Sequence, residues 1–490
     1  MIKRYFILLA FIASLLFACK PDKSITDPDP EPDPEPNKPS ANAYVNSWIY
    51  DEMSFFYLWD IPSYRRVNFE LYPEDFFESI LYKRGAKDGD RFSWIQEDFV
   101  ELLDLLSGVT PYDIGFEYVG YRVGITDVIG QILYVKPGTD AEAVGLKRGD
   151  LFTKINGTTL NTTNWYSLLS SSETSLTITF LDIYTGATTN KTVKKIAKYE
   201  ENPVYLDKVH EVNGHKIGYL VYNFFASGPT YGNFTYDKKL NDAFGRFKSE
   251  GITELVLDLR YNSGGSMNSA TLLGSMITPD FNTNNIFTKL EYNPLIQEAL
   301  INEYGKDVLV DKFKDKLETG EAINNVGNTI KSLYVLTSRW TASASEMVIN
   351  GLKPYMNGKP IILIGDITVG KNVGSITIFE EDDPENKWGM QPIICRYFNK
   401  DGNADFLNGF APDFVEKDNF LDDKLPLGDL NERMLKIAIE HITTGKYVPS
   451  TRSRSGVSGQ ITAGSSVEHK AWAGKTIVDD SLLKKLNIGR

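Results

Sequence analysis

The chain has 490 residues, enough for about three domains of ordinary size. Hydrophobic residues make up 42% and aromatic residues 12%, so most of the chain is expected to form packed globular cores rather than disordered segments. The formal net charge of −13 would repel a phosphate backbone, and there is no long basic stripe with interleaved aromatic residues, so we expect no nucleic-acid partner.

The first 19 residues, MIKRYFILLAFIASLLFAC, combine a short basic start, an apolar run and a final cysteine, Cys19. This pattern resembles a bacterial lipoprotein signal, in which the leader is removed and the cysteine is lipidated. A transmembrane anchor is the alternative, but the apolar run is short for a bilayer, which requires about 20 residues. We therefore predict a signal peptide over residues 1–18, a lipid anchor on Cys19 and a location in the bacterial cell envelope, on the periplasmic side or at the cell surface. The other cysteine, Cys395, is then an unpaired thiol.

The next segment, KPDKSITDPDPEPDPEPNKPS, repeats proline and acidic residues. Frequent proline prevents helix formation, and like charges favour an extended spacer. We predict a tether over residues 19–42 that holds the folded body away from a membrane surface.

Three segments with helical periodicity follow the tether. Apolar residues recur at helical spacing in AYVNSWIYDEMSFFYLWDIP, which ends before Pro62, and two more helices are predicted from Pro73 and from Glu97. Together they predict an N-terminal helical domain over residues 43–112. Their aromatic side chains are better explained as core than as a ligand site.

Residues 113–199 alternate with a period of two and contain the segment VKPGTDAEAVGLKRGDLFTKINGTTL. This segment resembles the PDZ domains of bacterial proteases, with their P-G-(S/T)-x-A turn, A-G-L-x-x-G-D and I-N-G motifs, although Val144 replaces the usual alanine. The resemblance implies a PDZ-like β-barrel domain whose exposed strand edge accepts an extended peptide. The peptide-binding loop would lie at Gly115, Phe116, Glu117 and Tyr118.

Residues 200–445 alternate predicted strands, such as KIGYLVYNFF and ITELVLDLR, with helices such as YDKKLNDAFGRFKSEG. This order predicts an α/β domain around a mixed sheet. Residues 446–490 are rich in Ser, Gly and Thr and are expected to be loosely ordered, except for a short helix over their final DSLLKKLNI.

Three segments of this last domain contain residues that could perform chemistry. WTASASEM places Thr341, Ser343 and Ser345 between a predicted strand and a predicted helix. Such hydroxyl residues can cap the helix, with Glu346 completing a capping box, or present a nucleophile. The other segments are LVLDLRYNSGGS, which ends in two glycines, and LIGDITVGKNVGS, which contains Lys371. Each pattern is weak by itself.

In this order the segments resemble the C-terminal processing peptidases, also called tail-specific proteases, with their motifs D-x-R-x-N-x-G-G, S-A-S-A-S-E, G-x-x-T-x-G-K and G-x-x-P-D. The matching stretches are residues 258–265, 341–346, 365–371 and 409–413, and DRFSWI at 90–95 resembles the family's D-P-x-S element with Arg91 in place of proline. The resemblance covers residues 43–445. It implies a multidomain α+β protein with an N-terminal helical domain, a PDZ domain and an α/β protease core of the ClpP/crotonase type, acting on protein or peptide substrates without a cofactor or metal.

Carried over by position, the family's nucleophile falls on Ser343 and its general base on Lys371. A serine hydroxyl needs a neighbouring base to take its proton, and a lysine can do so only when neutral, so Lys371 should be buried. The oxyanion donors would be the backbone N–H of Ala344 and that of Gly264 or Gly265. The chain has only four histidines, none in a recognisable triad or zinc-ligand spacing.

Two points stay open at this level. The family often has a glutamine that orients the lysine, whereas Ser375 occupies that place here. The main alternative function is a catalytically inactive, PDZ-containing lipoprotein that binds peptides on the same fold; retention of both Ser343 and Lys371 favours the enzyme. The sequence does not determine the oligomeric state.

Overall fold

The computed structural model describes residues 39–230, 232–418, 424–447, 462–470 and 473–478. Cys19, the predicted signal peptide, nearly all of the predicted tether and the predicted final helix lie outside the described residues. Among the helices that are described, none combines the length and apolar character that a membrane span requires.

The N-terminal region is helical, as its periodicity predicts. It contains α1 (Ala41–Phe56), the 3-10 turn η1 (Tyr64–Arg66), α2 (Pro73–Ile80) and α3 (Phe99–Leu106). Proline starts α2, where its missing N–H costs nothing, and the Asp98 carboxylate caps α3. The buried faces of α1 and α2 belong to the same hydrophobic cluster as the helices of the α/β core, so this region packs directly on that core.

Residues 113–199 contribute most of an antiparallel sheet in the order β23-β3-β4-β5-β7-β8, with β6 paired to β5. The helices α4 (Asp140–Ala143) and α5 (Trp165–Leu169) accompany it, and the Thr139 hydroxyl caps α4. Alternate residues of its strands fill one hydrophobic cluster. The strand bounds are β3 (Phe116–Val123), β4 (Asp127–Val135), β5 (Leu151–Ile155), β6 (Thr158–Thr159), β7 (Ser175–Leu181) and β8 (Thr188–Lys194).

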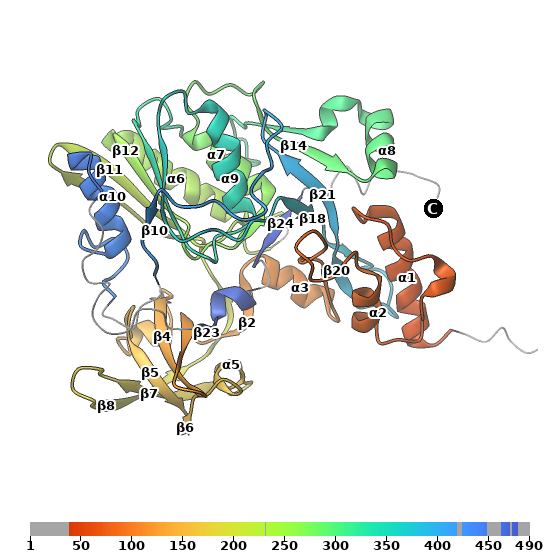
Figure 1. Ribbon diagram of the computed structural model, residues 1–490, viewed down its shortest axis with the longest axis horizontal. Coiled ribbons are helices and arrows are strands. Elements are labelled where there is room, and N and C mark those ends of the chain that lie inside the picture. Colours follow the sequence, from red (N-terminus) through yellow and green to blue (C-terminus); the bar gives the residue numbers. More distant parts are fainter. Residues whose placement is uncertain (1–38, 231, 419–423, 448–461, 471–472, 479–490) are drawn as a thin grey trace, which may run out of the picture. The chain divides into compact units, whose positions relative to one another are not determined.

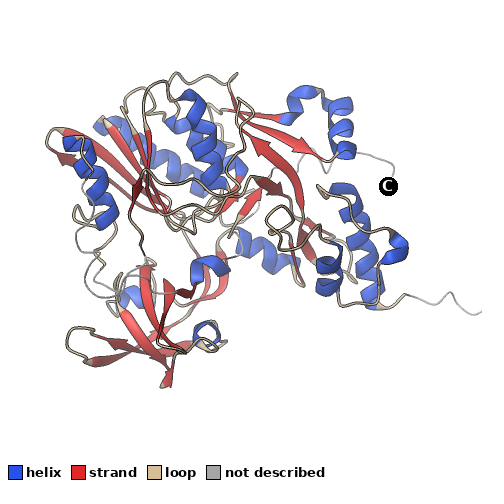
Figure 2. Cartoon of the chain, viewed as in Figure 1, coloured by secondary structure: helices blue, strands red, loops and turns tan. Residues whose placement is uncertain are grey.

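The α/β core has a six-stranded mixed sheet in the order β10-β11-β12-β16-β17-β22, as predicted, with helices beside it (Figure 2). Its first pair is antiparallel and the others are parallel. Leu255 and Leu257 face the cluster that includes α6, α7 and α9, whereas Val256 faces the cluster that includes α10. The sheet is therefore covered on both faces, which explains why the middle residues of its central strands β12, β16 and β17 are apolar. The bounds are β10 (Val204–Val212), β11 (His215–Tyr222), β12 (Glu254–Asp258), β16 (Leu333–Thr337), β17 (Ile361–Gly365), β22 (Phe414–Val415), α6 (Thr235–Glu250), α7 (Met267–Ile277), α9 (Ala344–Leu352) and α10 (Arg433–Thr444).

A second six-stranded sheet, in the order β13-β24-β18-β21-β14-β15, adjoins the core (Figure 1). Two short sheets join the regions: β1-β20-β19 links the N-terminal region to the core, and β2 pairs with β9. The bounds are β1 (Trp94–Gln96), β2 (Val109–Asp113), β9 (Ile196–Glu200), β13 (Gly264–Ser266), β14 (Ile286–Tyr292), α8 (Pro294–Tyr304), β15 (Val310–Lys312), β18 (Val373–Ser375), β19 (Ile378–Phe379), β20 (Gly389–Gln391), β21 (Ile393–Phe398) and β24 (Lys475–Ile477).

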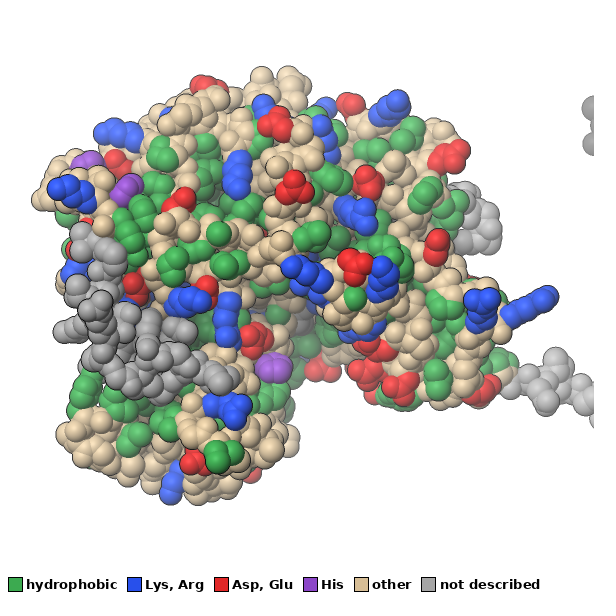
Figure 3. Space-filling model, in the orientation of Figure 1, with side chains coloured by type: hydrophobic (Ala, Val, Ile, Leu, Met, Phe, Trp, Pro, Cys, Tyr) green, Lys and Arg blue, Asp and Glu red, His purple; other side chains and the backbone are tan. Residues whose placement is uncertain are grey.

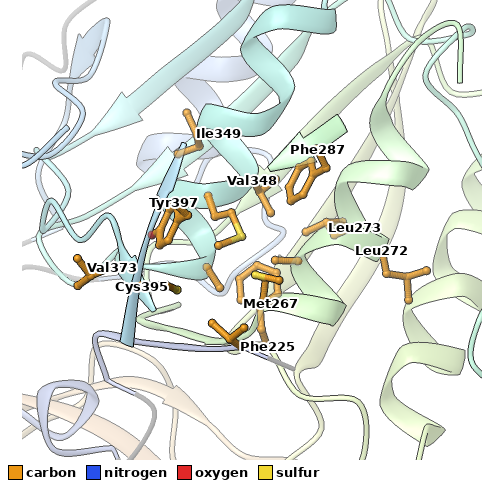
Figure 4. Packing of buried hydrophobic residues seen from close by; sticks show 14 of the residues in the cluster. Phe225, Met267, Leu272, Leu273, Phe287, Val348, Ile349, Val373, Cys395 and Tyr397 are labelled. Atoms are coloured by element: carbon orange, nitrogen blue, oxygen red, sulfur yellow. The ribbon is translucent and has the colours of Figure 1, made fainter. Parts of the chain in front are cut away.

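Apolar side chains from α7, α9, β14, β18 and β21 pack together beside this second sheet (Figure 4). Val348 and Ile349 are the labelled side chains of α9 in that packing. Cys395 is buried in the same cluster, and burial raises the pKa of its thiol to about 12.

On the face drawn in Figure 3, basic and acidic side chains are intermixed, in keeping with the charge pattern of the sequence.

The expectation that residues 446–490 are loosely ordered is wrong for residues 462–470 and 473–478. These residues form β23 (Thr462–Ser465), the 3-10 turn η5 (Ser466–His469) and β24. Their composition is poor in the apolar residues that mark strands, but remote parts of the chain provide their pairing partners: β23 adds to the edge strand β3, and β24 lies between β13 and β18. A three- or four-residue strand of this kind carries no periodicity of its own.

Candidate active site

Ser343 lies at the joint between β16 and α9, with backbone angles φ 63° and ψ −115°. Positive φ is uncommon for a residue with a side chain and persists only where the surroundings enforce it. The side chain is fully buried, and the backbone N–H donates to Glu346 Oε2 at 2.8 Å. That bond is part of a capping box, so the capping and nucleophile interpretations of this segment are compatible in one geometry.

The Glu346 carboxylate connects the two predicted catalytic residues through their backbones. Its Oε2 accepts from the N–H groups of Ser343 and Lys371, both at 2.8 Å, and its Oε1 accepts from Gly370 N–H at 2.7 Å and the Thr368 hydroxyl at 2.6 Å. Burial raises the pKa of Glu346 to about 7, although all four donors favour the ionised form. From the sequence we assigned Glu346 only a capping role. The sign of a further role was a single acidic residue in a segment that otherwise has small and apolar residues.

Lys371 is 0% exposed, and its side chain forms no ion pair among the described contacts. Its Nζ donates to the backbone oxygen of Gly474 at 2.5 Å and lies 4.9 Å from the centre of the Phe92 ring. Burial lowers the pKa of Lys371 to about 7, against the opposing charge of Asp90. A substantial fraction of this lysine is therefore neutral near pH 7 and available as a base.

The segment DRFSWI lies beside the lysine. The Asp90 carboxylate accepts from the N–H groups of Phe92 and Ser93 at 2.8 and 2.9 Å and from the Tyr57 hydroxyl at 2.7 Å. Arg91, which replaces the family's proline, donates to the Gly370 carbonyl at 3.1 Å. The N-terminal region thus supplies a wall of the lysine pocket, including the Phe92 ring that the sequence motif did not identify as part of the site.

The two predicted glycines approach the nucleophile in left-handed backbone conformations, φ 119° and 130°. A Cβ at Gly264 would lie 2.8 Å from Ser343 Cβ, and a Cβ at Gly265 would lie 2.0 Å from the Phe225 carbonyl oxygen, so neither position has room for a side chain. Gly264 N–H donates to Asn262 Oδ1 at 3.0 Å. The glycine loop and Ala344, the first residue of α9, therefore flank Ser343.

Ser375 lies on β18, and its hydroxyl donates to Gln391 Oε1 at 2.8 Å and contacts the Thr476 carbonyl at 3.3 Å. Its described hydrogen bonds do not include Lys371. Gln391, on β20, is a further buried polar residue next to the site that the sequence patterns did not indicate.

The Ser343 hydroxyl forms its hydrogen bond with the Thr476 hydroxyl. In the described part of the chain, the bonds of Ser343 and Lys371 thus lead to residues 474–476 rather than directly to one another.

The residues predicted for peptide binding lie at the start of β3. Gly115 N–H donates to Asp113 at 2.7 Å, Phe116 is buried, and Tyr118 N–H donates to the Ser466 hydroxyl at 2.8 Å. The Glu117 carboxylate is 2.8 Å from Lys136 Nζ and equally far from Lys470 Nζ. This loop therefore contacts Ser466 and Lys470 of the C-terminal segment.

The architecture is a mixed α/β fold of the kind that S41 peptidases have. A crystal structure named "Putative S41 protease", from Bacteroides fragilis, is similar over 85% of this chain and 100% of its own, with a TM-score of 0.64 and 29% sequence identity. The model for Peptidase family S41 matches residues 216–416, and that for the Peptidase S41 N-terminal domain matches residues 44–94. The chain belongs to peptidase family S41.

Two relatives named as proteases are similar at lower identity. A carboxyl-terminal-processing protease of Picosynechococcus sp. is 27% identical over 288 residues, 57% of this chain and 59% of the relative. A probable CtpA-like serine protease of Staphylococcus aureus is 25% identical over 309 residues, 61% of this chain and 52% of the relative. The matched region thus spans somewhat more than half the length of both relatives.

Proposed function

We propose that this protein is a serine endopeptidase in which Ser343 is the nucleophile and Lys371 the general base. The observation that carries the proposal is the shared support of the two residues: a single buried carboxylate, Glu346, holds both backbones, while burial gives the lysine a pKa of about 7. A peptide-binding protein would gain nothing from a desolvated lysine with a lowered pKa or from a buried serine at positive φ.

In the proposed reaction Ser343 Oγ attacks the carbonyl carbon of a peptide bond while its proton passes to Lys371 Nζ. The tetrahedral intermediate collapses when the C–N bond breaks and the lysine returns that proton to the leaving amine. The acyl-enzyme is then hydrolysed by a water molecule that Lys371 deprotonates.

The negative oxygen of the intermediate would be stabilised by the N–H of Ala344, at the N-terminus of α9, and by an N–H of the 264–265 loop. The absence of side chains at Gly264 and Gly265 lets the substrate backbone approach this loop closely.

The substrate would be a protein or peptide segment in extended form, captured at the edge of β3 as an added strand. PDZ domains bind peptides in this way, and we assign residues 113–199 to such a domain with its loop at Gly115–Tyr118. We further propose that Cys19 carries a lipid anchor and that the enzyme works in the bacterial cell envelope.

Labelling with a fluorophosphonate, followed to completion by intact-mass measurement, tests the catalytic pair. One adduct on the full chain, absent from Ser343→Ala and strongly slowed in Lys371→Ala, is the expected result. Ser345→Ala is the matched control, because its hydroxyl donates to the Asn262 carbonyl at 3.0 Å and it should keep the adduct. An adduct that persists in Ser343→Ala would refute the assignment of the nucleophile.

A further inference from the structure

The C-terminal segment contributes a strand to the sheet that contains the candidate active site. β24 lies between β13 and β18 and runs parallel to both, with Gly264 opposite Lys475 and Ser375 opposite Ile477. The chain's own backbone thus fills the position between the glycine loop and the strand that follows Lys371. An extended substrate that is to reach Ser343 alongside the glycine loop needs the same position.

The side chains of the proposed catalytic pair are engaged by this segment. The Ser343 hydroxyl is hydrogen-bonded to the Thr476 hydroxyl, and Lys371 Nζ donates to the Gly474 carbonyl at 2.5 Å. Ser343, Lys371 and Thr476 are all fully buried. A side-chain hydroxyl therefore occupies the position in front of the nucleophile.

Residues 474–478 are held against the candidate active site by their backbone and by one long side chain. Gly474 N–H donates to the Ser263 carbonyl at 2.7 Å, and Val478 N–H donates to the Ser375 carbonyl at 2.9 Å. Lys475 is buried, with its Nζ bonded to the Phe92 carbonyl at 2.7 Å.

The same segment also covers the edge of β3. β23 pairs with β3 in antiparallel fashion, with Gly464 opposite Gly120, and Ser465 Oγ donates to the Tyr118 carbonyl at 3.0 Å. Past β23, the His469 ring lies on Tyr166 of α5, with 3.9 Å between ring centres. The edge that we assign to peptide capture is therefore already paired.

An ion-pair contact fixes the segment between its two strands. Lys470 Nζ is 2.8 Å from Glu117 and 2.8 Å from Glu201, both of which are buried carboxylates. Two residues before Lys470, the Glu468 carboxylate accepts a hydrogen bond from Trp340 Nε1 at 2.8 Å. Trp340 lies three residues before Ser343 in the sequence. Substituting Lys470 should thus loosen both strands without touching the catalytic residues.

We propose that residues 462–470 and 473–478 are an intramolecular competitor: the first stretch pairs with the β3 edge and the second lies against Ser343 and Lys371, and substrates gain access only when this segment leaves. The inference rests on the proposed function and adds its regulation. A tethered segment competes at an effective concentration in about the millimolar range, so it can hold the enzyme back even if its intrinsic affinity is weak. A peptide that pairs with β3 displaces one anchor and thereby weakens the other.

The first experiment measures occupancy without relying on activity. Hydrogen exchange of the full chain, carried out in a Ser343→Ala background to prevent self-cleavage, should show protected amides at Gly474 and Val478. Gly474→Pro should abolish the protection of the Val478 amide, because proline at 474 lacks the N–H that holds the segment to Ser263 and cannot adopt the φ of +63° found at Gly474. Unprotected amides in the parent chain would overturn the proposal.

The second experiment measures how release of the segment changes the reactivity of Ser343 and the rate of proteolysis. In the full chain with Ser343 intact, Gly474→Pro and Lys470→Glu should raise the fluorophosphonate labelling rate and the cleavage of unfolded casein by about tenfold or more, as expected on removal of a tethered competitor. Lys446→Glu makes the same charge change at an exposed position outside the segment and should leave both rates unchanged. A synthetic peptide of residues 462–478 should inhibit Gly474→Pro, and the same peptide with proline at position 474 should not.

The outcomes separate the two claims. Equal rates in all variants, with Ser343 reactive throughout, would refute the competitor. If exchange confirms the bound segment and its release by Gly474→Pro while Ser343 never reacts in any variant, then the occupancy stands and the peptidase proposal fails.

Discussion

Two regions of this molecule bury a lysine, with opposite results. The first is a lysine–carboxylate cluster at the end of β4. There Lys136 is 3% exposed, and its Nζ lies 2.5 Å from Asp113, 2.8 Å from Glu117 and 3.0 Å from Glu201. In the candidate active site Lys371 is 0% exposed, and its described hydrogen bond is to a backbone carbonyl. The two lysines are therefore equally buried and differ in their hydrogen-bond and ion-pair partners.

The pKa values differ accordingly. Burial by itself would lower the pKa of Lys136, but the surrounding carboxylates raise it well above the usual value, so this lysine stays charged. At Lys371 burial dominates, and the pKa falls to about 7. Removing a charge from water is costly unless an opposite charge replaces the lost hydration. Lys136 is thus a structural cation held by carboxylates, whereas Lys371 is a candidate base.

Replacing Lys371 with alanine should have the largest effect. We expect casein cleavage to fall by about 10³-fold, within the range attributed to a general base, while the free energy of unfolding does not decrease, since an unpaired buried amine stabilises little. Urea denaturation and initial rates measure the two quantities. A variant that loses stability but keeps its rate would place Lys371 in the same class as Lys136.

Lys136→Met should show the converse behaviour. It leaves buried Asp113 without its cation and leaves Glu117 and Glu201 with Lys470 alone, so we expect a loss of about 3–5 kcal/mol in the free energy of unfolding, the range for breaking a buried ion pair. Lys154→Met, at an exposed position on β5 of the same sheet, is the control and should change little. Unchanged stability in Lys136→Met would show that the cluster does not hold its charges as described.

Glu346→Gln tests whether the carboxylate positions both catalytic backbones. An amide places N–H donors against some of the four donors now bound, so we expect kcat to fall by about 10- to 100-fold, as for a small misplacement of reacting groups, with little change in KM. Glu298→Gln, on the exposed side of α8, is the control. A change confined to KM would argue against positioning.

The pH dependence of kcat/KM should report the lysine pocket. The base acts when unprotonated and its folded-state pKa is lowered to about 7, so activity should rise about tenfold per pH unit below that value and level off above it. A midpoint of the pH profile near the ordinary pKa of lysine, well above neutrality, would mean that water reaches the Lys371 side chain. Lys154→Met should leave the midpoint unchanged.

Ser375→Ala should have the smallest effect, within about twofold in kcat, because a lost hydrogen bond to a second buried polar group rather than to the base contributes only modestly. Its hydroxyl donates to Gln391. A tenfold or greater loss would instead support the orienting role that its position in the motif predicts.

Much of the architecture follows from local patterns. The helical period predicts α1, α2 and α3, and the apolar runs predict β12, β16 and β17, because each element is long enough to show its own repeat. The order of the motifs also indicates the strand–helix joint at Ser343.

The other features depend on residues that are distant in the sequence. β24 is three residues long and acquires its role only by pairing with strands more than 100 positions earlier in the chain. Lys136 and Lys371 cannot be distinguished by neighbouring sequence, since the carboxylates that surround the first come from three separate strands or loops. The function of Glu346 is similarly visible only once Gly370 and Lys371 are folded against it.

The buried thiol of Cys395 gives the molecule a built-in reporter. It lies on β21 beside Gly374 of β18, where a Cβ at that glycine would be 2.9 Å from the sulfur, and its pKa of about 12 keeps it protonated and unreactive. A thiol-specific dye can therefore react with it only during moments when the sheet around β18 opens. The rate of that reaction, compared between the parent chain and Gly474→Pro, would time how often the neighbouring strand detaches in the absence of any substrate.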